Sequence, residues 1–409
     1  MTPQAEALVE YFESGIKGAG EPGRLGVELE HIITDDRYHA VPYGGPAGIG
    51  SLLEELAEGY DEQLRDAEGD LLGLMRPGAA LTLEPAAQLE LSAGPYEEVG
   101  AIRCDFEEFH RSLAKTLDRR GQRAVIVGYQ PASKAADLPL IPKDRYRFMD
   151  EHFAAIGPYG RFMMRGSAST QISIDYYSAA DCLRKLRLTS AASPLFALIC
   201  DNSAIFEGEP APHGLMRTEI WRECDPARCN LVPGVLDPRF TLEDYAAYVL
   251  ATPAVYARDA QGALFATEQT FAELFDGRPM DREDVEHALS MLFNDVRLKT
   301  YIEIRTADAM PVPFVAAYAA LVKGLFYSDA NLDALDALFD GVTEADVAVA
   351  KANLMEDGYG AQVYGRCAAD LVDELFERAY DALARNERSY LIPLRQMASK
   401  RTTLAALGR

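Results

Sequence analysis

The chain has 409 residues, 48% of them hydrophobic and 25% charged, which is the composition of a folded globular protein with a sizeable core. Its formal net charge of −24 and pI near 4.7 argue against non-specific binding of DNA or RNA, which depends on clustered Lys and Arg. The sequence has no apolar run long enough to span a membrane and no signal-peptide pattern, and its scattered Cys indicate reduced thiols. We therefore expect a cytoplasmic protein that binds neither nucleic acid nor membranes.

Two kinds of hydrophobic periodicity alternate along the chain. A helical period predicts helices at 5–17, 50–67, 97–119, 179–202, 242–250, 282–293, 312–326, 344–353 and 365–386. Alternating patterns predict strands at 24–33, 72–74, 82–83, 89–92, 124–128, 170–175, 215–221 and 301–306. This alternation differs from the continuous apolar runs of a parallel sheet, and it predicts an α+β fold: a mostly antiparallel sheet with one polar face, backed by helices. We expect one compact domain over residues 1–327 and a helical C-terminal extension over residues 328–409 that packs on it.

Several of the predicted strands carry an unusual polar face. Side chains two apart on a strand point to the same side, so Glu28 and Glu30 lie opposite Val27 and Leu29. The corresponding polar sets on other strands are Gln88, Glu90 and Ser92; Ser169, Gln171, Ser173 and Asp175; Arg217, Glu219 and Trp221; and Tyr301, Glu303 and Arg305. Lys is absent from these sets, whereas a face that is only solvated is usually rich in Lys and Thr.

Carboxylates gathered on one face indicate a cation site. Like charges close together repel one another and resist ionisation unless a cation lies among them. Mg²⁺ binds carboxylate oxygens together with substrate phosphates, while Arg binds phosphate or carboxylate through parallel hydrogen bonds. The polar face therefore predicts a metal–phosphate site, and a half-exposed, solvated sheet face is the alternative.

Motifs for other chemistries are absent or out of context. The sequence GAGEPG at 18–23 has the glycine spacing of a dinucleotide-binding loop, but it follows a predicted helix rather than a strand. The sequence GGPAGIGS at 44–51 lacks the Lys of a phosphate-binding loop. Cys224 and Cys229 have no second pair with which to hold zinc, and no G-x-S-x-G motif indicates a serine hydrolase.

A series of longer segments resembles one enzyme family. In chain order, GVELE, LTLEPAAQLELSAGP, GYQP, IPKDRYRFMDEHF, MMRGSASTQISIDY, LMRTEIWRECDPAR and NDVRLKTYIEIRTAD resemble the glutamate–cysteine ligases shared by plants and many bacteria. The resemblance runs from about residue 23 to about residue 329. It implies the carboxylate–amine ligase fold related to glutamine synthetase, an antiparallel sheet curved into a funnel, and makes residues 1–327 the catalytic domain.

The family's chemistry is then what the resemblance implies for this chain. It implies that the γ-carboxylate of L-glutamate is joined to the amine of L-cysteine, in the first step of glutathione synthesis. The reaction would use ATP and Mg²⁺, or Mn²⁺ in its place, and would pass through a γ-glutamyl phosphate. The protein would act as a monomer or a homodimer on these small molecules.

The resemblance also implies roles for individual residues. The metal-binding carboxylates would be Glu28, Glu30, Glu84, Glu90 and Glu303, and Glu303 would also be catalytic. Arg305, also catalytic, would contact the transferring phosphate of ATP. Arg217 would bind the α-carboxylate of glutamate, and the amino-acid pocket would be completed by Gln171, Trp221, Tyr146 and Arg147.

Two segments depart from the pattern of the family. Ala86 and Ala87 stand where its members usually have two Gly, which predicts a backbone regular enough to accommodate a Cβ. Arg165 precedes by one position the Arg that is usual there, so its role stays open. Three alternatives remain: a ligase of the same fold that uses another amine, a phosphagen-type kinase with a related sheet, and a non-catalytic protein whose metal or nucleotide site has decayed.

Overall fold

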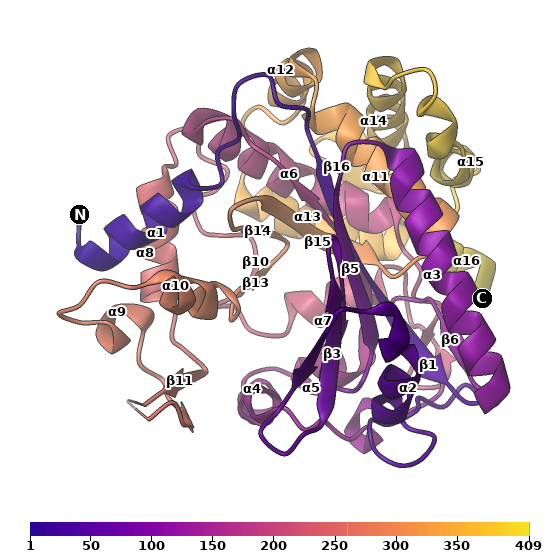
Figure 1. Ribbon diagram of the computed structural model, residues 1–409. Coiled ribbons are helices and arrows are strands. Elements are labelled where there is room, and N and C mark those ends of the chain that lie inside the picture. Colours follow the sequence, from indigo (N-terminus) through magenta and orange to yellow (C-terminus); the bar gives the residue numbers. More distant parts are fainter. Residues whose placement is uncertain (260, 409) are drawn as a thin grey trace.

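The alternating segments form one large sheet at the centre of the structure (Figure 1). The structure is a computed structural model that describes residues 1–259 and 261–408. The strands of this sheet are β1 (Leu25–Thr34), β2 (Glu62–Arg65), β3 (Leu71–Arg76), β4 (Ala79–Leu83), β5 (Leu89–Tyr96), β6 (Arg123–Val125), β7 (Ser169–Ile174), β14 (Val296–Leu298) and β15 (Ile302–Asp308). They lie in the order β14-β15-β7-β1-β5-β4-β3-β2, with β6 paired to β1, and each of these neighbouring pairs is antiparallel.

Helices lie on both sides of this sheet. They are α1 (Pro3–Glu13), α2 (Ile49–Leu56), α3 (Val99–Arg120), α4 (Asp144–Ile156), α5 (Gly160–Gly166), α6 (Ala179–Ile199), α7 (Met216–Arg222), α8 (Leu242–Ala251), α9 (Phe271–Leu274), α10 (Arg282–Leu289), α11 (Val312–Phe326), α12 (Asp329–Leu338), α13 (Glu344–Asp357), α14 (Ala368–Ala382), α15 (Ile392–Ser399) and α16 (Leu404–Gly408). Helices α3, α6 and α11 pack on the sheet, whereas α1 contacts α8 and α10 on its other side (Figure 1). The predicted α+β class, with a mostly antiparallel sheet, is confirmed, and the sheet is open rather than closed into a barrel.

Short two-stranded sheets lie in the segments that connect these helices and strands. They are β8 (Ile205–Phe206) with β9 (Glu209–Pro210), β10 (Cys229–Asn230) with β13 (Phe293–Asn294), β11 (Tyr256–Arg258) with β12 (Leu264–Ala266), and β16 (Gln362–Val363) with β17 (Arg366–Cys367). The pair of β10 and β13 is parallel and joins the end of α7 to the start of β14. It therefore ties the helix that carries Arg217 to the edge of the large sheet.

The alternation along β1 decides which side chains reach the polar face. Val27 and Leu29 lie in the main hydrophobic core, where each buried side chain of this kind stabilises the fold by about 1.5–3 kcal/mol. Because successive side chains point to opposite faces, Glu28 and Glu30 must point away from that core. A slip of one residue in the register would bury both carboxylates in the core, so apolar packing fixes the position of the polar face.

Several predicted elements are wrong in type or extent, among them the following three. The helix predicted at 50–67 ends at Leu56, and the chain returns as strand β2 at Glu62–Arg65. The helix predicted at 282–293 ends at Leu289, before β13. The strand predicted at 215–221 is helix α7, which begins after Leu215 in a left-handed conformation (φ 55°). Its β-branched residues favour a strand, but over seven residues tertiary packing overrides that weak preference.

The C-terminal segment packs behind the sheet, on the side opposite the polar face. Helices α12, α14 and α15 contact α11, and α13 contacts α6. Gly324 of α11 makes this approach close, since a Cβ there would lie 2.7 Å from the carbonyl oxygen of Ala379. The division at residue 327 stays a proposal. In residues 1–259 and 261–408, no helix is long and apolar enough to cross a membrane.

Candidate active site

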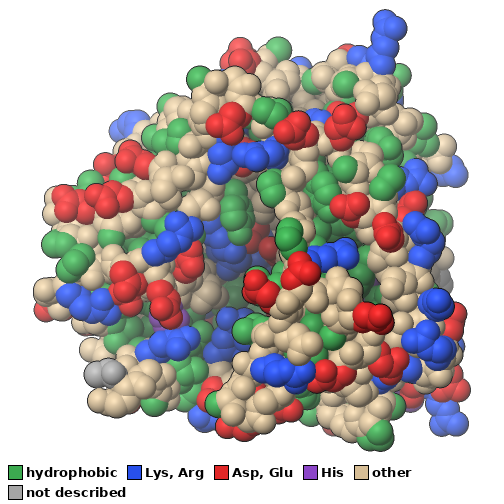
Figure 2. Space-filling view, in the orientation of Figure 1, with side chains coloured by type: hydrophobic (Ala, Val, Ile, Leu, Met, Phe, Trp, Pro, Cys, Tyr) green, Lys and Arg blue, Asp and Glu red, His purple; other side chains and the backbone are tan. Residues whose placement is uncertain are grey.

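A cavity of about 520 Å³ lies between the polar face of the sheet and the helices α1, α4, α5, α7 and α10. Figure 2 shows a hollow on this side of the molecule with Lys and Arg side chains on its walls. The predicted site residues that line the cavity are Glu28, Glu30, Glu84, Glu90, Tyr146, Gln171, Arg217, Trp221 and Arg305. Two predicted residues, Glu303 and Arg147, do not line it.

The strands β1, β4 and β5 supply an acidic wall. Glu30 and Glu90 are direct partners across the ladder between β1 and β5, and Glu28 stands opposite Ser92 and Gln171. Side chains in such opposite positions have Cβ atoms about 4.5–5.5 Å apart, so like charges there destabilise the pair. The sheet therefore brings together carboxylates that are far apart in the sequence.

Glu84 joins this wall from the turn between β4 and β5. The turn is closed by the backbone N–H of Glu84, which donates to the carbonyl of Gln88 at 2.9 Å, and by the N–H of Ala87, which donates to the carbonyl of Glu84 at 2.9 Å. Ala87 has a φ of 67°, a left-handed conformation that costs a residue with a Cβ about 1 kcal/mol or more. The expectation of a regular backbone at Ala87 is therefore wrong, and a Gly would adopt this conformation without strain.

Hydrogen bonds hold two of the four carboxylates in place. Glu30 accepts from the backbone N–H of Ser169 at 2.9 Å and from the hydroxyl of that residue at 2.7 Å. Glu90 accepts from the hydroxyls of Thr82 at 3.0 Å and Ser92 at 3.2 Å. These donors are all neutral, so they fix the orientation of the carboxylates without cancelling their charge.

The acidic wall resists ionisation. Burial, followed by the charge of Glu303, raises the pKa of Glu28. Burial, followed by the charge of Glu28, raises the pKa of Glu90 well above its usual range. Burial, followed by the charge of Glu84, raises the pKa of Glu30 to about 7. A bound cation would remove the repulsion that holds these pKa values high.

The donors of the acidic wall fit Mg²⁺ in kind. Within the described residues, Glu28, Glu84 and Glu90 form no ion pair with Lys or Arg, so their oxygens are open to a cation. In the same residues, no three side chains of His, Cys, Asp or Glu converge closely enough to hold a metal by themselves. Mg²⁺ at nucleotide sites typically binds one or two carboxylates and takes its other ligands from phosphates and water, so the arrangement suits it.

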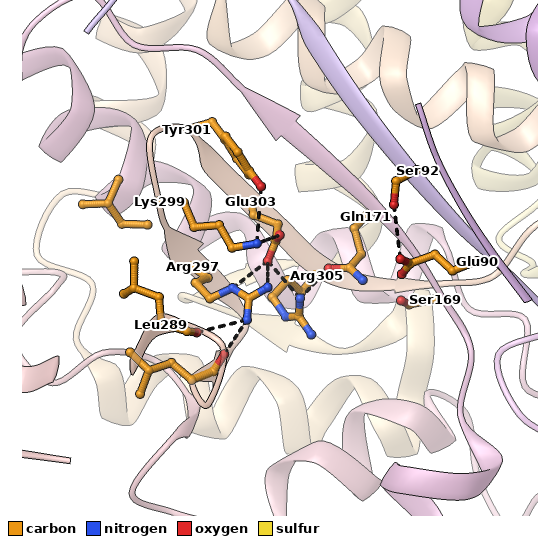
Figure 3. A network of polar contacts seen from close by, with 12 residues as sticks. Glu90, Ser92, Ser169, Gln171, Leu289, Arg297, Lys299, Tyr301, Glu303 and Arg305 are labelled. Atoms are coloured by element: carbon orange, nitrogen blue, oxygen red, sulfur yellow. Dashed lines mark hydrogen bonds and ion pairs between the residues drawn. The ribbon is translucent and has the colours of Figure 1, made fainter. Parts of the chain in front are cut away.

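The strands β14 and β15 supply an opposite, cationic wall, shown in Figure 3. Glu303 is fully buried below it and accepts hydrogen bonds from Arg297 at 2.8 Å, Lys299 at 3.1 Å and Arg305 at 2.8 Å. The side chain of Arg305 also donates to the amide oxygen of Gln171 on β7. Burial by itself would raise the pKa of Glu303, but the three cations outweigh it and hold that pKa well below its usual range.

Helix α7 places Arg217 and Trp221 on the same side of the cavity. Residues four apart share one face of a helix, and the guanidinium of Arg217 lies 5.4 Å from the ring centre of Trp221. Arg217 donates from Nη1 to the backbone oxygen of Arg305 at 3.0 Å. Its Nε and the indole Nε1 of Trp221 are buried and have no partner in the described part of the chain. A ligand with acceptor oxygens would satisfy both donors.

Helix α4 contributes Tyr146 and a neighbour that the sequence did not single out. Tyr146 donates to the carbonyl of Leu83 at 3.2 Å, and Arg145 donates to the Tyr146 hydroxyl at 3.1 Å. The Nε of Arg145 is buried without a partner among the described residues, and the residue lines the cavity. Arg147 instead lies 3.5 Å from Glu151 with 58% of its side chain exposed.

Arg147 therefore does not line the cavity in this structure, and its place in the amino-acid pocket stays a prediction that the structure does not support. Residues one or two apart on a helix point in different directions, so Arg147 turns to solvent when Tyr146 faces the cavity. Arg165 also lies outside the cavity lining. It forms a two-pronged ion pair with Asp150, at 2.7 and 2.5 Å, and donates to the carbonyl of Leu138 at 2.7 Å. These bonds assign Arg165 to holding α4 and α5 together.

A second cavity of about 450 Å³ continues from the acidic wall toward the other end of the same sheet face. Glu28 and Tyr301 line both cavities, so the two are neighbours. The basic residues of the second cavity are Lys17, Arg24 and Arg76. The polar face thus offers two adjoining spaces that share one carboxylate.

Sequence reasoning missed Arg297, Lys299 and Arg145. Arg297 and Lys299 alternate with the apolar Val296 and Leu298, the same signal that identified Glu28 and Glu30. The strand prediction began at residue 301 and left this alternation out. Nothing in the sequence pattern distinguishes Arg145 from Arg147, because which of them faces the cavity depends on how α4 is seated.

Comparison with known proteins is consistent with the site. Residues 24–404 match the family described as glutamate-cysteine ligase family 2. The chain is 30% identical over 339 residues to a chloroplastic glutamate–cysteine ligase of Arabidopsis thaliana, covering 81% of this chain and 64% of that protein. It is 27% identical over 388 residues to chloroplastic glutamate–cysteine ligase B of Oryza sativa subsp. japonica, covering 93% and 77% of the two chains.

A solved structure shares the fold. The crystal structure of a glutamate–cysteine ligase from Francisella tularensis in complex with AMP superposes with a TM-score of 0.55 at 11% sequence identity. The similarity covers 94% of this chain and 83% of that one. At this identity the likeness concerns the arrangement of helices and strands only.

Proposed function

The chain belongs to glutamate–cysteine ligase family 2, and on that premise we propose that it joins the γ-carboxylate of L-glutamate to the amine of L-cysteine at the expense of ATP. This would be the first step of glutathione synthesis. The observation that carries the proposal is one cavity with an acidic wall from β1, β4 and β5 and a cationic wall from β14 and β15. Such a pair of walls suits a triphosphate with its cation on one side and an anionic substrate on the other.

The acidic wall would hold Mg²⁺ through Glu28, Glu84 and Glu90, whose oxygens carry no ion pair among the described residues. Glu30 would act beside them, already oriented by Ser169. When bound, Mg²⁺ would neutralise charge on the triphosphate. Glu303 is also a metal candidate by its place in the family motif, although in this structure its oxygens are occupied by Arg297, Lys299 and Arg305.

The cationic wall would stabilise the transferring phosphoryl group. An oxygen of the glutamate γ-carboxylate attacks the γ-phosphorus, the bond from phosphorus to ADP breaks, and a γ-glutamyl phosphate forms. Arg305 is positioned by Glu303 and Gln171 before any substrate arrives, so little reorganisation accompanies the change in charge. The amine of cysteine then attacks the acyl carbon, phosphate leaves, and the amine loses a proton.

Arg217 would bind the α-carboxylate of glutamate. Its Nε is a buried donor without a partner in residues 1–259 and 261–408, and Nη1 is anchored to the backbone of Arg305. This anchor keeps the two arginines adjacent, so a glutamate held by Arg217 would extend its γ-carboxylate toward Arg305. Trp221 would contact the carbon chain, and Arg145 with Tyr146 would face the acceptor amino acid.

The nucleotide would enter through the second cavity. Glu28 lies between the two cavities, where a triphosphate could reach from the basic residues Lys17, Arg24 and Arg76 to the cationic wall. The adenosine would then occupy the space beside β1, β4 and β5. The cytoplasmic location remains a prediction, since the two plant relatives named above are chloroplastic. The monomeric or homodimeric state also remains a prediction.

Product identification tests this function. The purified protein, incubated with ATP, Mg²⁺, glutamate and cysteine, should release ADP and phosphate and yield γ-glutamylcysteine by mass spectrometry. A panel of other amines in place of cysteine identifies a different acceptor if one is used. A stable phosphorylated guanidine would identify a phosphagen-type kinase instead. Absence of any cysteine-stimulated ADP release would contradict the proposal.

A further inference from the structure

A buried lysine from the C-terminal segment reaches the wall of the site. Lys351 of α13 and Asp295, between β13 and β14, are 4% and 8% exposed and form an ion pair at 2.6 Å. Lys351 also donates to the side-chain oxygen of Asn230 at 3.2 Å. A small cavity beside the main one is lined by Lys351 together with Arg217, Trp221 and Arg305, so the ammonium lies close behind the substrate-binding residues.

The partners of Lys351 are connected to both arginines of the site. The backbone oxygen of Asp295 accepts from the N–H of Arg305 at 2.9 Å. Asn230, which has a left-handed φ of 64°, donates to the carbonyl of Arg222 at 3.2 Å and so holds the end of α7. A displacement of Lys351 would therefore move Arg305 through one backbone hydrogen bond, and it would move Arg217 through helix α7.

The charges around Arg217 explain why its connection to Lys351 matters for ligand binding. Asp308, Glu30 and Asp295 are anions whose charges favour the protonated guanidinium of Arg217. Asp308 is held by Asn202 and Ser203 at 2.8 and 2.7 Å. Each of these three carboxylates therefore has a hydrogen-bond or ion-pair partner other than Arg217.

Of these three anions, only Asp295 is paired with a cation in the described ranges 1–259 and 261–408. Nε of Arg217 is buried and has no hydrogen-bond partner among the described residues. Without Lys351, the unpaired charge of Asp295 would attract Arg217 or Arg305 and compete with an anionic ligand.

We propose that Lys351 is a positioning residue: it neutralises Asp295 and thereby keeps Arg217 available for the carboxylate of the amino-acid substrate. The inference rests on the proposed function, because it assumes that Arg217 binds glutamate. It gives the C-terminal segment a part in substrate binding in addition to its packing behind the sheet. Loss of the Lys351 charge should weaken glutamate binding more than it slows turnover.

The test is a comparison of Lys351→Met with the wild-type chain. Trp221 is the only Trp in the sequence and lies beside Arg217, so its fluorescence reports glutamate binding directly. We expect Lys351→Met to raise the Kd and the KM for glutamate about tenfold, while kcat changes less than about threefold and the KM for ATP is unchanged. The double variant Lys351→Met with Asp295→Asn should restore binding, because the competing anion is gone.

Further variants keep the result decisive. If Lys351→Met does not fold, Lys351→Gln retains hydrogen bonding without charge and should still weaken glutamate binding. The matched control is Lys323→Met, which breaks the Lys323–Glu387 pair of 2.7 Å on the far side of the sheet and should cost stability without changing the Kd. An unchanged Kd in the Lys351 variants, or an equal rise in Lys323→Met, would overturn the inference. A wild-type chain that neither binds glutamate nor makes the product would instead overturn the proposed function on which it depends.

Discussion

The buried carboxylates on the two walls of the cavity lie in opposite electrostatic environments. On the cationic wall, Glu303 is surrounded by Arg297, Lys299 and Arg305, and its pKa is lowered. On the acidic wall, Glu28 and Glu90 form no ion pair with Lys or Arg in the described part of the chain, and burial together with neighbouring carboxylates raises their pKa values. The carboxylate of the cationic wall is compensated by the protein alone, whereas the carboxylates of the acidic wall would be compensated by the cation that we propose for them. The cationic wall is therefore preorganised, since its ion pairs are formed within the protein.

The largest expected effect is on the chemical step, from removing one cation of the complete wall. Arg305→Gln should lower kcat/KM by about a thousandfold, since single groups that stabilise a transferring phosphoryl or an oxyanion have effects of this size. The fold should survive because Arg297 and Lys299 still compensate Glu303. The measurement is ADP release with glutamate and cysteine. Arg147→Gln, which changes an arginine outside the cavity, serves as the control and should keep full activity.

The second prediction applies the same substitution to both walls. Glu303→Gln removes the buried anion that three cations share and should cost about 3 kcal/mol of unfolding free energy. Glu28→Gln relieves repulsion on the acidic wall and should leave stability unchanged or slightly higher.

Substitution of Glu28 should therefore affect activity and stability differently. Glu28→Gln should weaken the use of Mg·ATP far more than it weakens folding, and it should reduce the rise in Tm that Mg²⁺ gives the wild-type chain. Urea unfolding and a Mg²⁺ titration of activity measure both quantities. Retention of Mg²⁺-dependent activity in Glu28→Gln would refute the role assigned to the acidic wall.

The contrast between the walls also shows how far the sequence could lead. Period-two alternation placed Glu28, Glu30, Glu90 and Gln171 correctly on one face, because strand geometry leaves no freedom in that choice. The same rule was wrong for α7, yet Arg217 and Trp221 still meet at the cavity, since residues four apart share a helix face.

The rest of the site depends on tertiary structure. That Glu303 is covered by cations follows from the pairing of β14 with β15, which sets Arg297 opposite Glu303. That Arg145 rather than Arg147 faces the cavity follows from the seating of α4. The contribution of Lys351 requires the C-terminal helices to pack on α6, a contact between residues far apart in the chain that local patterns do not encode.

The smallest effect, on stability as a function of pH, separates the walls without any substrate. Glu303 has a lowered pKa, so its contribution is fully present above its ordinary value of 4.5 and is lost only as the pH falls below that value. Glu30 has a pKa raised from 4.5 to about 7, so the native state holds a proton that the unfolded state has released between these values. Stability from this group therefore falls as the pH rises through that window.

Glu30 should thus contribute up to about 3 kcal/mol less to the stability of the metal-free chain at about pH 7.5 than at about pH 5. Burial lowers the pKa values of His31 and His110 to about 3 and about 4, so these two residues change stability in the opposite sense over the same interval. The quantity to compare at the two pH values is therefore the difference in unfolding free energy between the wild-type chain and Glu30→Gln. Urea unfolding in the presence of EDTA at the two pH values measures the difference. Glu84→Gln removes the charge that, after burial, most raises the pKa of Glu30 and should weaken this pH dependence, and Mg²⁺ should reverse it by stabilising the ionised wall. A difference between the wild-type chain and Glu30→Gln that stays constant over this interval would show that Glu30 is already compensated, and the contrast between the walls would fail.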